Sequence, residues 1–334
     1  MEARLPEGWE NSIPVFPPDS KGKGSRVTSN AVMNAISNVI PELISGSADL
    51  TPSNLTNIEG SDAFQHNSYH GRNIHYGVRE HAMGSIVNGV NLHKGLISAG
   101  GTFFIFSDYM RPAIRLSALS EIQSIWILTH DSIGLGEDGA THQPVEHLAS
   151  LRAMPNLVVL RPADANEVSF SWKFAINHRH GPTALILSRQ NLPTLDRTVY
   201  NPAEGTLKGG YVLADLGPGK PEMILMASGS EVHLITEAGN VLKGEGHSIR
   251  LVSFPSWELF DIQDSAYKES VLPTGVTKRL VVEAGSSLGW HKYIGVEGKT
   301  VCMESFGTSG PADELFEKYG LKPEDMALPP GAVE

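Results

Sequence analysis

One polar segment holds most of the side chains suited to chemistry. Residues 129–144, with the sequence THDSIGLGEDGATHQP, contain two histidines, three acidic residues and three glycines. The segment follows the apolar run 125–128, which predicts a buried strand. In an open parallel α/β sheet, ligands bind beyond the carboxyl ends of the strands, and glycine lets the backbone approach them closely. We therefore interpret this segment as a ligand-binding loop.

A second candidate side chain is the carboxylate of Glu80, in the sequence NIHYGVREHAMG at residues 73–84. The glycine turn at Gly77 precedes a predicted helix whose apolar positions include Ile86 and Val90. Glu80 falls in the first turn of this helix, where the helix dipole favours a carboxylate. A purely structural role at the helix start therefore stands beside a catalytic one.

Four side chains are candidates for an anion-binding site, namely Arg26, Arg79, His130 and Arg189. A guanidinium group binds phosphate through two parallel hydrogen bonds. Arg189 is the strongest candidate because it lies at the carboxyl end of the predicted strand 183–187, between Ser188 and Gln190. Although the net charge is −11, a phosphorylated substrate can bind where such side chains converge.

Aromatic residues end a predicted strand within residues 96–106. Side chains alternate between the faces of a regular strand, so Phe104 and Phe106 should share one face, opposite Phe103. We expect some of these rings to lie in the core and one to provide a stacking platform.

Two further motifs favour structural interpretations. His142 and His147 resemble a zinc motif, but they are five residues apart with Pro144 between them, and zinc ligands on one helix need to share a face. We therefore expect no metal site there. The sequence SGSE at 228–231 follows a strand and opens a helix, which fits an ordinary turn with a helix cap better than an anion-binding turn.

Composition narrows the class of protein. Hydrophobic residues make up 40% and charged residues 19% of the 334, as in an ordinary globular chain. The acidic net charge and the lack of a basic run argue against nucleic acid, and no apolar stretch is long enough for a membrane span. Cys302 is the only cysteine, which fits a reducing compartment, and no signal peptide is recognisable, so we expect a protein that is not secreted.

The elements alternate between helix and strand along the chain, which implies parallel sheets covered by helices. In the first half we expect strands at 46–50, within 96–106, and at 124–130, 157–160 and 183–187, and helices at 27–39, 79–93, 108–120, 145–151 and 164–177. Pro112 is tolerable only in the first turn of its helix. In the second half we expect strands at 223–227, 249–254, 280–283 and 300–303, and a helix at 231–242.

This pattern predicts two successive three-layer α/β domains with mostly parallel sheets. Residues 1–24 are rich in proline and are expected to be a linker, which suggests that another domain precedes them. We assign residues 25–195 to the first domain, 196–221 to a linker rich in Pro, Gly and Asp, and 222–334 to the second domain.

Taken together, these segments resemble the transketolase family. The likeness covers nearly the whole chain and is carried by GSADL at 46–50, PSN at 52–54, IHYGVREH at 74–81, residues 129–144, LSRQNLP at 187–193, GGYVL at 209–213, ASGSEV at 227–232 and FG at 306–307. The resemblance implies a pyrimidine-binding domain of the thiamine-diphosphate fold at 25–195, followed by a transketolase C-terminal domain.

The resemblance also implies what such a chain would need from elsewhere. Transketolases begin with a domain that binds the diphosphate of thiamine diphosphate through a magnesium or calcium ion, using a Gly-Asp-Gly motif with a downstream Asn. This sequence contains no Gly-Asp-Gly. We therefore expect the diphosphate-binding domain to be absent and the isolated chain to be inactive.

Site roles follow from the resemblance, residue by residue. Glu80 would bind N1′ of the aminopyrimidine and, with His142, would be catalytic. The cofactor-binding set would be Asp49, Glu80, Phe103, Phe106 and Tyr109. The substrate-binding set would be Arg26, Ser53, His130, Asp138, His142 and Arg189.

The function implied is transfer of a two-carbon ketol unit from a ketose phosphate to an aldose phosphate, in the cytoplasm or a plastid. The partners implied are sugar phosphates and either a second copy or a diphosphate-binding domain. Two alternatives stay open: a β-type subunit of a two-chain thiamine-dependent 2-oxoacid dehydrogenase, and a non-catalytic dimerising or regulatory fragment. Nothing in the sequence excludes dihydroxyacetone synthase, a close relative of transketolase.

Overall fold

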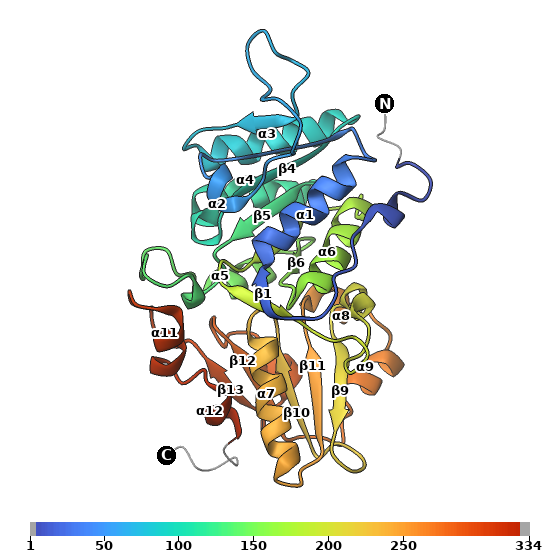
Figure 1. Ribbon diagram of the computed structural model, residues 1–334, viewed down its shortest axis with the longest axis vertical. Coiled ribbons are helices and arrows are strands. Elements are labelled where there is room, and N and C mark those ends of the chain that lie inside the picture. The colour runs from blue at the N-terminus through green and yellow to red at the C-terminus, as the bar shows by residue number, and fades with distance from the viewer. Residues whose placement is uncertain (1–4, 328–334) are drawn as a thin grey trace.

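The first sheet contains six parallel strands in the order β3-β2-β4-β5-β7-β6. In the computed structural model, which describes residues 5–327, it forms the upper part of the molecule (Figure 1). Its strands are β2 Leu43–Ser47, β3 Asn73–His75, β4 Ile97–Phe103, β5 Ile125–Thr129, β6 Val158–Leu160 and β7 Thr183–Leu187. Residues 1–4 of the predicted linker and 328–334 of the predicted second domain lie outside the described residues.

Helices cover both faces of this sheet, because β5 alternates between two apolar cores. Ile125 and Ile127 face a core shared with α1 and α6, whereas Trp126 and Leu128 face a core shared with α3 and α4. Burying each such side chain contributes about 1.5–3 kcal/mol. The helices are α1 Ser25–Ser37, α2 Thr51–Asn54, α3 Glu80–His93, α4 Ser107–Leu119, α5 His147–Arg152 and α6 Ala165–Asn177, with 3-10 turns η1 Trp9–Ser12, η2 Phe104–Phe106 and η3 Ile133–Leu135.

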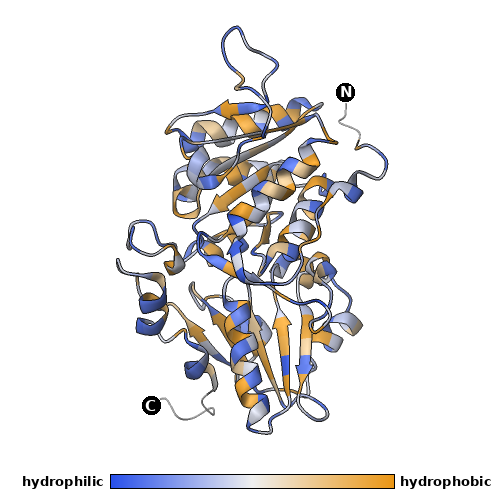
Figure 2. Cartoon of the chain, viewed as in Figure 1, coloured by the Kyte–Doolittle hydropathy of each residue, from blue (hydrophilic) through white to orange (hydrophobic). Residues whose placement is uncertain are grey.

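The second sheet has the order β13-β12-β10-β11-β9, and only β9 runs antiparallel to its neighbour. Its strands are β9 Tyr211–Leu216, β10 Met223–Ala227, β11 Ile249–Ser253, β12 Arg279–Glu283 and β13 Lys299–Cys302. The helices are α7 Glu231–Gly244, α8 Trp257–Asp261, α9 Ser265–Val271, α10 His291–Ile294, α11 Ala312–Lys318 and α12 Pro323–Ala327. The strands of this lower unit are predominantly hydrophobic (Figure 2), as expected of a sheet covered on both faces.

The prediction of two successive α/β domains with mostly parallel sheets is confirmed, but both predicted linkers need correction. Residues 196–221 contain the 3-10 turn η4 Ala203–Lys208 and strand β9, whose Tyr211 and Leu213 are buried. Glycines and prolines around this short strand masked its alternation. Residues 5–24 are also ordered, because Trp9 packs into the first core and β1 Asp19–Gly24 pairs with β8 Asn191–Thr194.

Two local expectations also differ from the structure. Strand β2 spans Leu43–Ser47 rather than the predicted 46–50. It ends before Asp49 because the φ of that residue, 62°, is incompatible with an extended strand. Helix α4 starts at Ser107 and continues through Pro112, which therefore lies beyond the first turn. The helix tolerates this proline because Met110, Ala113 and Ile114 around it are buried. Within residues 5–327, no helix is long and apolar enough to cross a membrane.

Candidate active site

The parallel order of the first sheet brings the candidate residues to one edge. The carboxyl ends of β2, β3, β4, β5 and β7 all point the same way, since every pairing among them is parallel. The segments that follow these ends carry Asp49 and Ser53, Glu80, Phe106 and Tyr109, His130 to His142, and Arg189. Ligands bind at this edge of open α/β sheets.

Two hydroxyl side chains bring the N-terminus of α1 against the end of β7. The backbone N–H of Ser188 donates to Ser25 Oγ at 2.7 Å, and the N–H of Ser25 donates to Ser188 Oγ at 3.0 Å. The next residues along the chain are Arg26 and Arg189, so these bonds place the two arginines at the same site. Gly24 permits the approach, since a Cβ there would lie 2.6 Å from the carbonyl oxygen of Arg189.

The cations of this site have no carboxylate partner. Within the described part of the chain, neither Arg26 nor Arg189 forms an ion pair, and Nε of Arg26 is buried without a hydrogen bond. Arg26 donates through Nη1 to the carbonyl oxygen of Ser53. Burial, and then the charge of Arg189, lower the pKa of Arg26. Two guanidinium groups that repel each other without a counter-ion form a site suited to an anion.

His130 lies beside these arginines in a buried and constrained position. Its backbone adopts the left-handed region at φ 63°, and its side chain is buried. Its Nδ1 lies 2.8 Å from Thr129 Oγ1, which itself accepts a hydrogen bond from Asn54 Nδ2 at 2.7 Å. Because the threonine hydroxyl then has its own proton to donate to Nδ1, the arrangement favours a histidine protonated on Nε2.

The pKa of His130 is lowered to about 3, first by burial and then by electrostatic interaction with Arg26, Arg189 and His142, in that order. His130 is therefore neutral at physiological pH. A neutral imidazole in this position can donate one hydrogen bond to an anion without adding a third charge to the arginine pair.

Aromatic rings form the other side of the site. Phe103 and Phe106 are stacked with centroids 5.7 Å apart, and the ring of Tyr109 lies 5.9 Å from Phe106. The ring of His142 meets Phe106 edge-on at 5.5 Å. The prediction that Phe106 shares a face with Phe104 is wrong, because the strand ends at Phe103 and the 3-10 turn η2 rotates Phe106 back onto it.

Three predicted carboxylates lie at the same edge of the sheet without joining this cluster. Glu80 is half-buried as the first residue of α3, whereas Asp49 and Asp138 are exposed on loops. Within residues 5–327 none of the three makes a hydrogen bond or an ion pair. Arg79, at the start of α3, is likewise exposed and separate from the arginine pair. These carboxylates are therefore available to a ligand.

The sequence interpretation missed the residues that support the site. Ser25 and Ser188 align the arginines, and Asn54 links Ser47 to Thr129 through hydrogen bonds of 2.7 Å each. Each lies near a strand end or beside a predicted helix start, and this position was the only feature of the sequence that could have indicated a supporting role. Small polar side chains at such positions are common, so their pairing is visible only in the fold.

Within residues 5–327, one group of side chains could meet at a metal ion, namely Asp108, Glu146 and His147, whose ligand atoms lie within 4.8 Å of one another. It does not include His142, so it differs from the zinc motif considered in the sequence. Both acids are exposed, and Asp108 Oδ2 lies 3.1 Å from His147 Nε2, which accounts for the grouping without a metal. The 228–231 turn is filled by the side chain of Arg161 and is no anion site.

The fold and the edge cluster define a two-domain α/β protein with a cationic, aromatic-lined site at the carboxyl edge of its first sheet. The family model described as transketolase, pyrimidine binding domain, matches residues 23–194. The model described as transketolase-like C-terminal domain matches residues 209–322. The chain therefore belongs to the transketolase family.

Relatives and solved structures agree with this assignment. The chain is 53% identical to a transketolase of Nostoc over 98% of its own length and 48% of the relative, and 50% identical to that of Geobacillus stearothermophilus over 98% and 49%. A Pichia stipitis transketolase in complex with sedoheptulose 7-phosphate has a TM-score of 0.92 at 46% identity, covering 97% of this chain and 48% of that one. The chain thus spans about half the length of these relatives.

A more distant solved structure has the same fold. It is described as a split gene transketolase, inactive β4 tetramer, and matches 92% of this chain and 96% of its own, with a TM-score of 0.73 at 23% identity. At that identity the likeness concerns the fold alone.

Proposed function

We propose that this chain forms the pyrimidine-binding half of a transketolase active site. That site transfers a two-carbon ketol unit from a ketose phosphate to an aldose phosphate with thiamine diphosphate as cofactor. The observation that carries the proposal is the convergence of Arg26, Arg189 and His130 beside the stacked rings of Phe103 and Phe106. Unpaired cations suit a sugar phosphate, and the partly exposed ring of Phe106 suits a heteroaromatic cofactor.

The phosphate of the sugar would bind between α1 and the end of β7. Arg26 and Arg189 would offer guanidinium donors, His130 would offer Nε2–H, and Ser53 lies next to them through its bond to Arg26. An anion would relieve the repulsion between the two arginines, which supports a phosphate rather than a neutral group. The hydroxyl groups of the donor sugar would be held by His142 and Asp138.

The residues present fit the pyrimidine part of thiamine diphosphate. Tyr109 is 66% exposed and Phe106 is half-buried, so this aromatic surface is open to a planar ring. Phe103, Phe106 and Tyr109 would hold that ring, with Asp49 at the rim. When bound, thiamine diphosphate supplies a nucleophilic carbon that takes up the two-carbon unit.

Glu80 would act as the acid–base group of this chain. Its carboxylate is half-buried at the start of α3 and has no partner among the described residues. It would hold and return a proton at N1′ of the pyrimidine, which is general acid–base catalysis from a fixed position. The diphosphate, with its magnesium or calcium ion, would be held by a separate diphosphate-binding domain, so the chain alone would be inactive.

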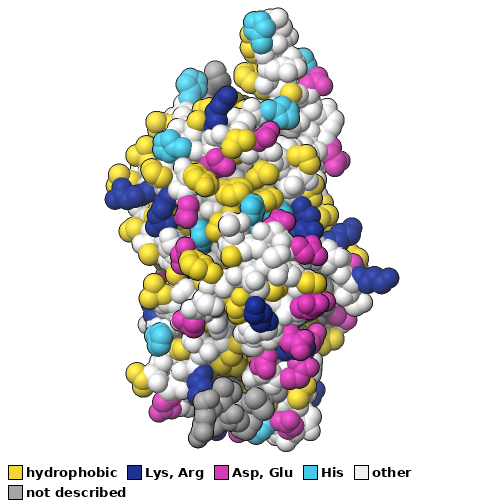
Figure 3. Space-filling view, turned by 90° about the vertical axis from the view of Figure 1, so that its left-hand side faces the viewer, with side chains coloured by type: hydrophobic (Ala, Val, Ile, Leu, Met, Phe, Trp, Pro, Cys, Tyr) yellow, Lys and Arg dark blue, Asp and Glu magenta, His cyan; other side chains and the backbone are white. Residues whose placement is uncertain are grey.

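An apolar face on α3 and α4 supports a second copy of this chain as a partner. Exposed large side chains lie on these two helices and on the segments that flank α3, and Ile86, Val90 and Leu96 line a groove. The exposed set is Val78, Ile86, Leu92, Leu96, Tyr109, Leu116 and Leu119. Hydrophobic side chains are also prominent on the upper half of the face drawn in Figure 3. A surface of this kind marks a protein interface, and we infer a homodimer.

The arginine pair also bears on the alternatives. A β-type subunit of a 2-oxoacid dehydrogenase has no phosphate group to bind, whereas Arg26 and Arg189 lie together without a counter-ion. The presence of Glu80 and His142 argues against a purely regulatory fragment. Relatives of this chain include proteins named as chloroplastic transketolases of Zea mays and Solanum tuberosum, which supports a location in the cytoplasm or a plastid.

The test is reconstitution with the diphosphate-binding domain of a transketolase, supplied as a separate chain. We expect ketol transfer from a ketose phosphate to an aldose phosphate only when both chains, thiamine diphosphate and magnesium are present. Each chain alone is the control. A reconstituted complex that binds the cofactor but decarboxylates 2-oxoacids without ketol transfer would instead support the dehydrogenase alternative.

A further inference from the structure

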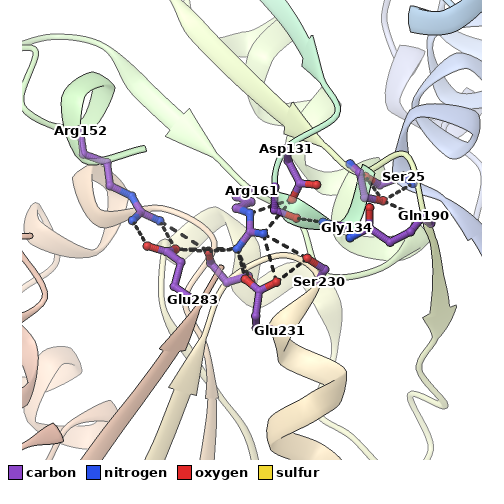
Figure 4. Close-up of polar contacts among 12 residues, drawn as sticks. Ser25, Asp131, Gly134, Arg152, Arg161, Gln190, Ser230, Glu231 and Glu283 are labelled. Carbon is purple, nitrogen blue, oxygen red and sulfur yellow. Dashed lines mark hydrogen bonds and ion pairs between the residues drawn. The ribbon is translucent and has the colours of Figure 1, made fainter. Parts of the chain in front are cut away.

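A buried cluster of five charged side chains joins the two domains (Figure 4). Its members are Asp131, Arg152 and Arg161 of the first domain and Glu231 and Glu283 of the second, and each is at most 2% exposed. Burying charges is costly unless each is paired and hydrogen-bonded, so such a cluster is weak evidence for stability by itself. Its position suggests another role.

Arg161 is the centre of the cluster. From just beyond β6, its Nε donates to Asp131 Oδ2 at 2.9 Å, and its Nη1 donates to Glu231 at the start of α7. Nη1 also donates to the carbonyl oxygen of Ser228 at 2.9 Å, and Nη2 donates to Ser230 Oγ at 3.1 Å. The planar fork of one guanidinium thus binds a residue of the first domain to a turn of the second.

Asp131 directly follows His130 and opens the loop 130–146 between β5 and α5, called here the β5–α5 loop. A second charged contact lies beyond the other end of this loop, where Arg152 of α5 donates to Glu283 Oε2 at 2.7 Å and Oε1 at 2.9 Å. Glu283 ends β12 and also accepts from Ser228 Oγ at 2.7 Å. Both flanks of the loop are therefore anchored to the second domain.

The middle of the β5–α5 loop is attached to the second domain as well. Nε2 of Gln143 donates to the carbonyl oxygens of Gly136 at 3.0 Å and Thr308 at 2.9 Å. The hydroxyl of Ser309 donates to the carbonyl oxygen of Glu137, and the N–H of Ser286 donates to that of Val145 at 2.9 Å. These contacts surround Asp138 and His142, the two residues proposed to hold the sugar hydroxyls.

We infer that Arg161 is a positioning residue, through which the C-terminal domain holds the β5–α5 loop in the geometry that presents His130, Asp138 and His142 to the substrate. The inference that the loop is held rests on the contacts alone, and its consequence for sugar binding rests on the proposed function. The C-terminal domain then acts on catalysis without touching the substrate.

Amide hydrogen exchange of the chain tests the holding of the loop. Arg161→Lys keeps the charge and removes the fork, and Arg250→Lys is the matched control because Arg250 binds Asp215 through two bonds away from the loop. We expect Arg161→Lys to speed exchange roughly tenfold or more in residues 130–146, with little change in β10 and β11. Arg250→Lys should leave the loop unchanged.

Unchanged loop exchange in Arg161→Lys overturns the inference, and so does an equal rise throughout both domains, which would indicate a general loss of stability. Should Arg161→Lys fail to fold, Gln143→Leu cuts the central attachment and has to give the same loop-confined increase. The exchange result does not depend on the proposed function.

A second test measures how Arg161→Lys changes the kinetics of the reconstituted enzyme. Arg161→Lys should lower kcat/KM about tenfold for unphosphorylated donors and at least as much for phosphorylated ones. Asp138 and His142 would bind hydroxyl groups common to both donors, whereas His130 would bind only the phosphate. A loss confined to phosphorylated donors, or no loss, would contradict a role through Asp138 and His142. If the unmutated complex transfers no ketol unit, the proposed function fails while the exchange arm still decides whether Arg161 holds the loop.

Discussion

The ring of Phe103 lies on the imidazole of His130, with centroids 3.8 Å apart and planes inclined by 32°. Phe103 ends β4 and His130 directly follows β5, so this contact joins the aromatic and the cationic parts of the site across two neighbouring parallel strands. It also excludes water from one face of the imidazole. The low pKa of His130, about 3, follows first from this burial and then from the nearby positive charges.

The first prediction concerns the protonation of His130. In the folded chain its imidazole should not titrate between pH 5 and 8, because its pKa lies near 3 rather than at 6.5. NMR of ring-labelled histidine, assigned with His130→Gln, measures this directly. A titration midpoint near pH 6.5 would contradict the buried, neutral state.

The same depressed pKa makes stability depend on pH. Below pH 6.5 the unfolded chain binds a proton at this histidine that the folded chain does not, so this contribution is complete above pH 6.5 and falls as the pH drops toward 3. The maximal slope is about 1.4 kcal/mol per pH unit. Denaturant unfolding of the unmutated chain and His130→Gln should show the difference shrinking with acidity, and a constant difference would rule this out.

Arg189→Ala should weaken the binding of phosphorylated sugars in the reconstituted enzyme. Losing a charged hydrogen bond to phosphate should raise KM roughly tenfold or more. An unphosphorylated donor such as hydroxypyruvate should be affected little. Arg250→Ala, which breaks an ion pair with Asp215 in the second domain, serves as the control. Equal losses on both donors would show that Arg189 does not bind phosphate.

Glu80→Ala should abolish activation of the cofactor while leaving the fold intact. Proton exchange at C2 of bound thiamine diphosphate should slow by about 10²–10⁴-fold, the usual contribution of a positioned acid–base group. Glu80→Gln, which keeps the shape and loses the carboxylate, should behave similarly. Exchange at the unmutated rate in either variant would remove Glu80 from the mechanism.

The isolated chain should self-associate through the apolar face of α3 and α4. Ile86 is 48% exposed and lines the groove on that face, so Ile86→Glu should shift the chain to a monomer in sedimentation velocity. Val296→Glu is the matched control, since Val296 is fully exposed in the second domain. A dimer that persists in Ile86→Glu and dissociates in Val296→Glu would place the interface elsewhere.

The isolated chain should also bind thiamine diphosphate poorly. Most of the charge of the cofactor is in its diphosphate and metal ion, which we assign to a separate domain. Calorimetric titration with the cofactor and magnesium should therefore give no micromolar binding. Micromolar affinity, or ketol transfer by the chain alone, would overturn the half-site proposal while leaving the family assignment intact.

The sequence alone was sufficient to predict much of the fold. Strands β7 and β10 were predicted with the bounds observed, and α3 and α6 to within one residue, because apolar periodicity and caps such as Asp164 act locally. The same patterns failed at β9, where a short edge strand lies among glycines, and at Phe106, where a strand turns into a 3-10 helix. In both places the outcome depends on packing against distant residues.

The sequence by itself determined which side chains stand at the ends of the strands, and therefore which candidates can reach a ligand. Only the tertiary structure decided which of them meet. Ser25 and Ser188, 163 residues apart, bond to each other and so align Arg26 with Arg189. Arg161 binds Asp131 on one side and Glu231 on the other. Local sequence specifies a strand and its exit, but the order of strands in a sheet and the docking of two domains arise from contacts between distant parts of the chain.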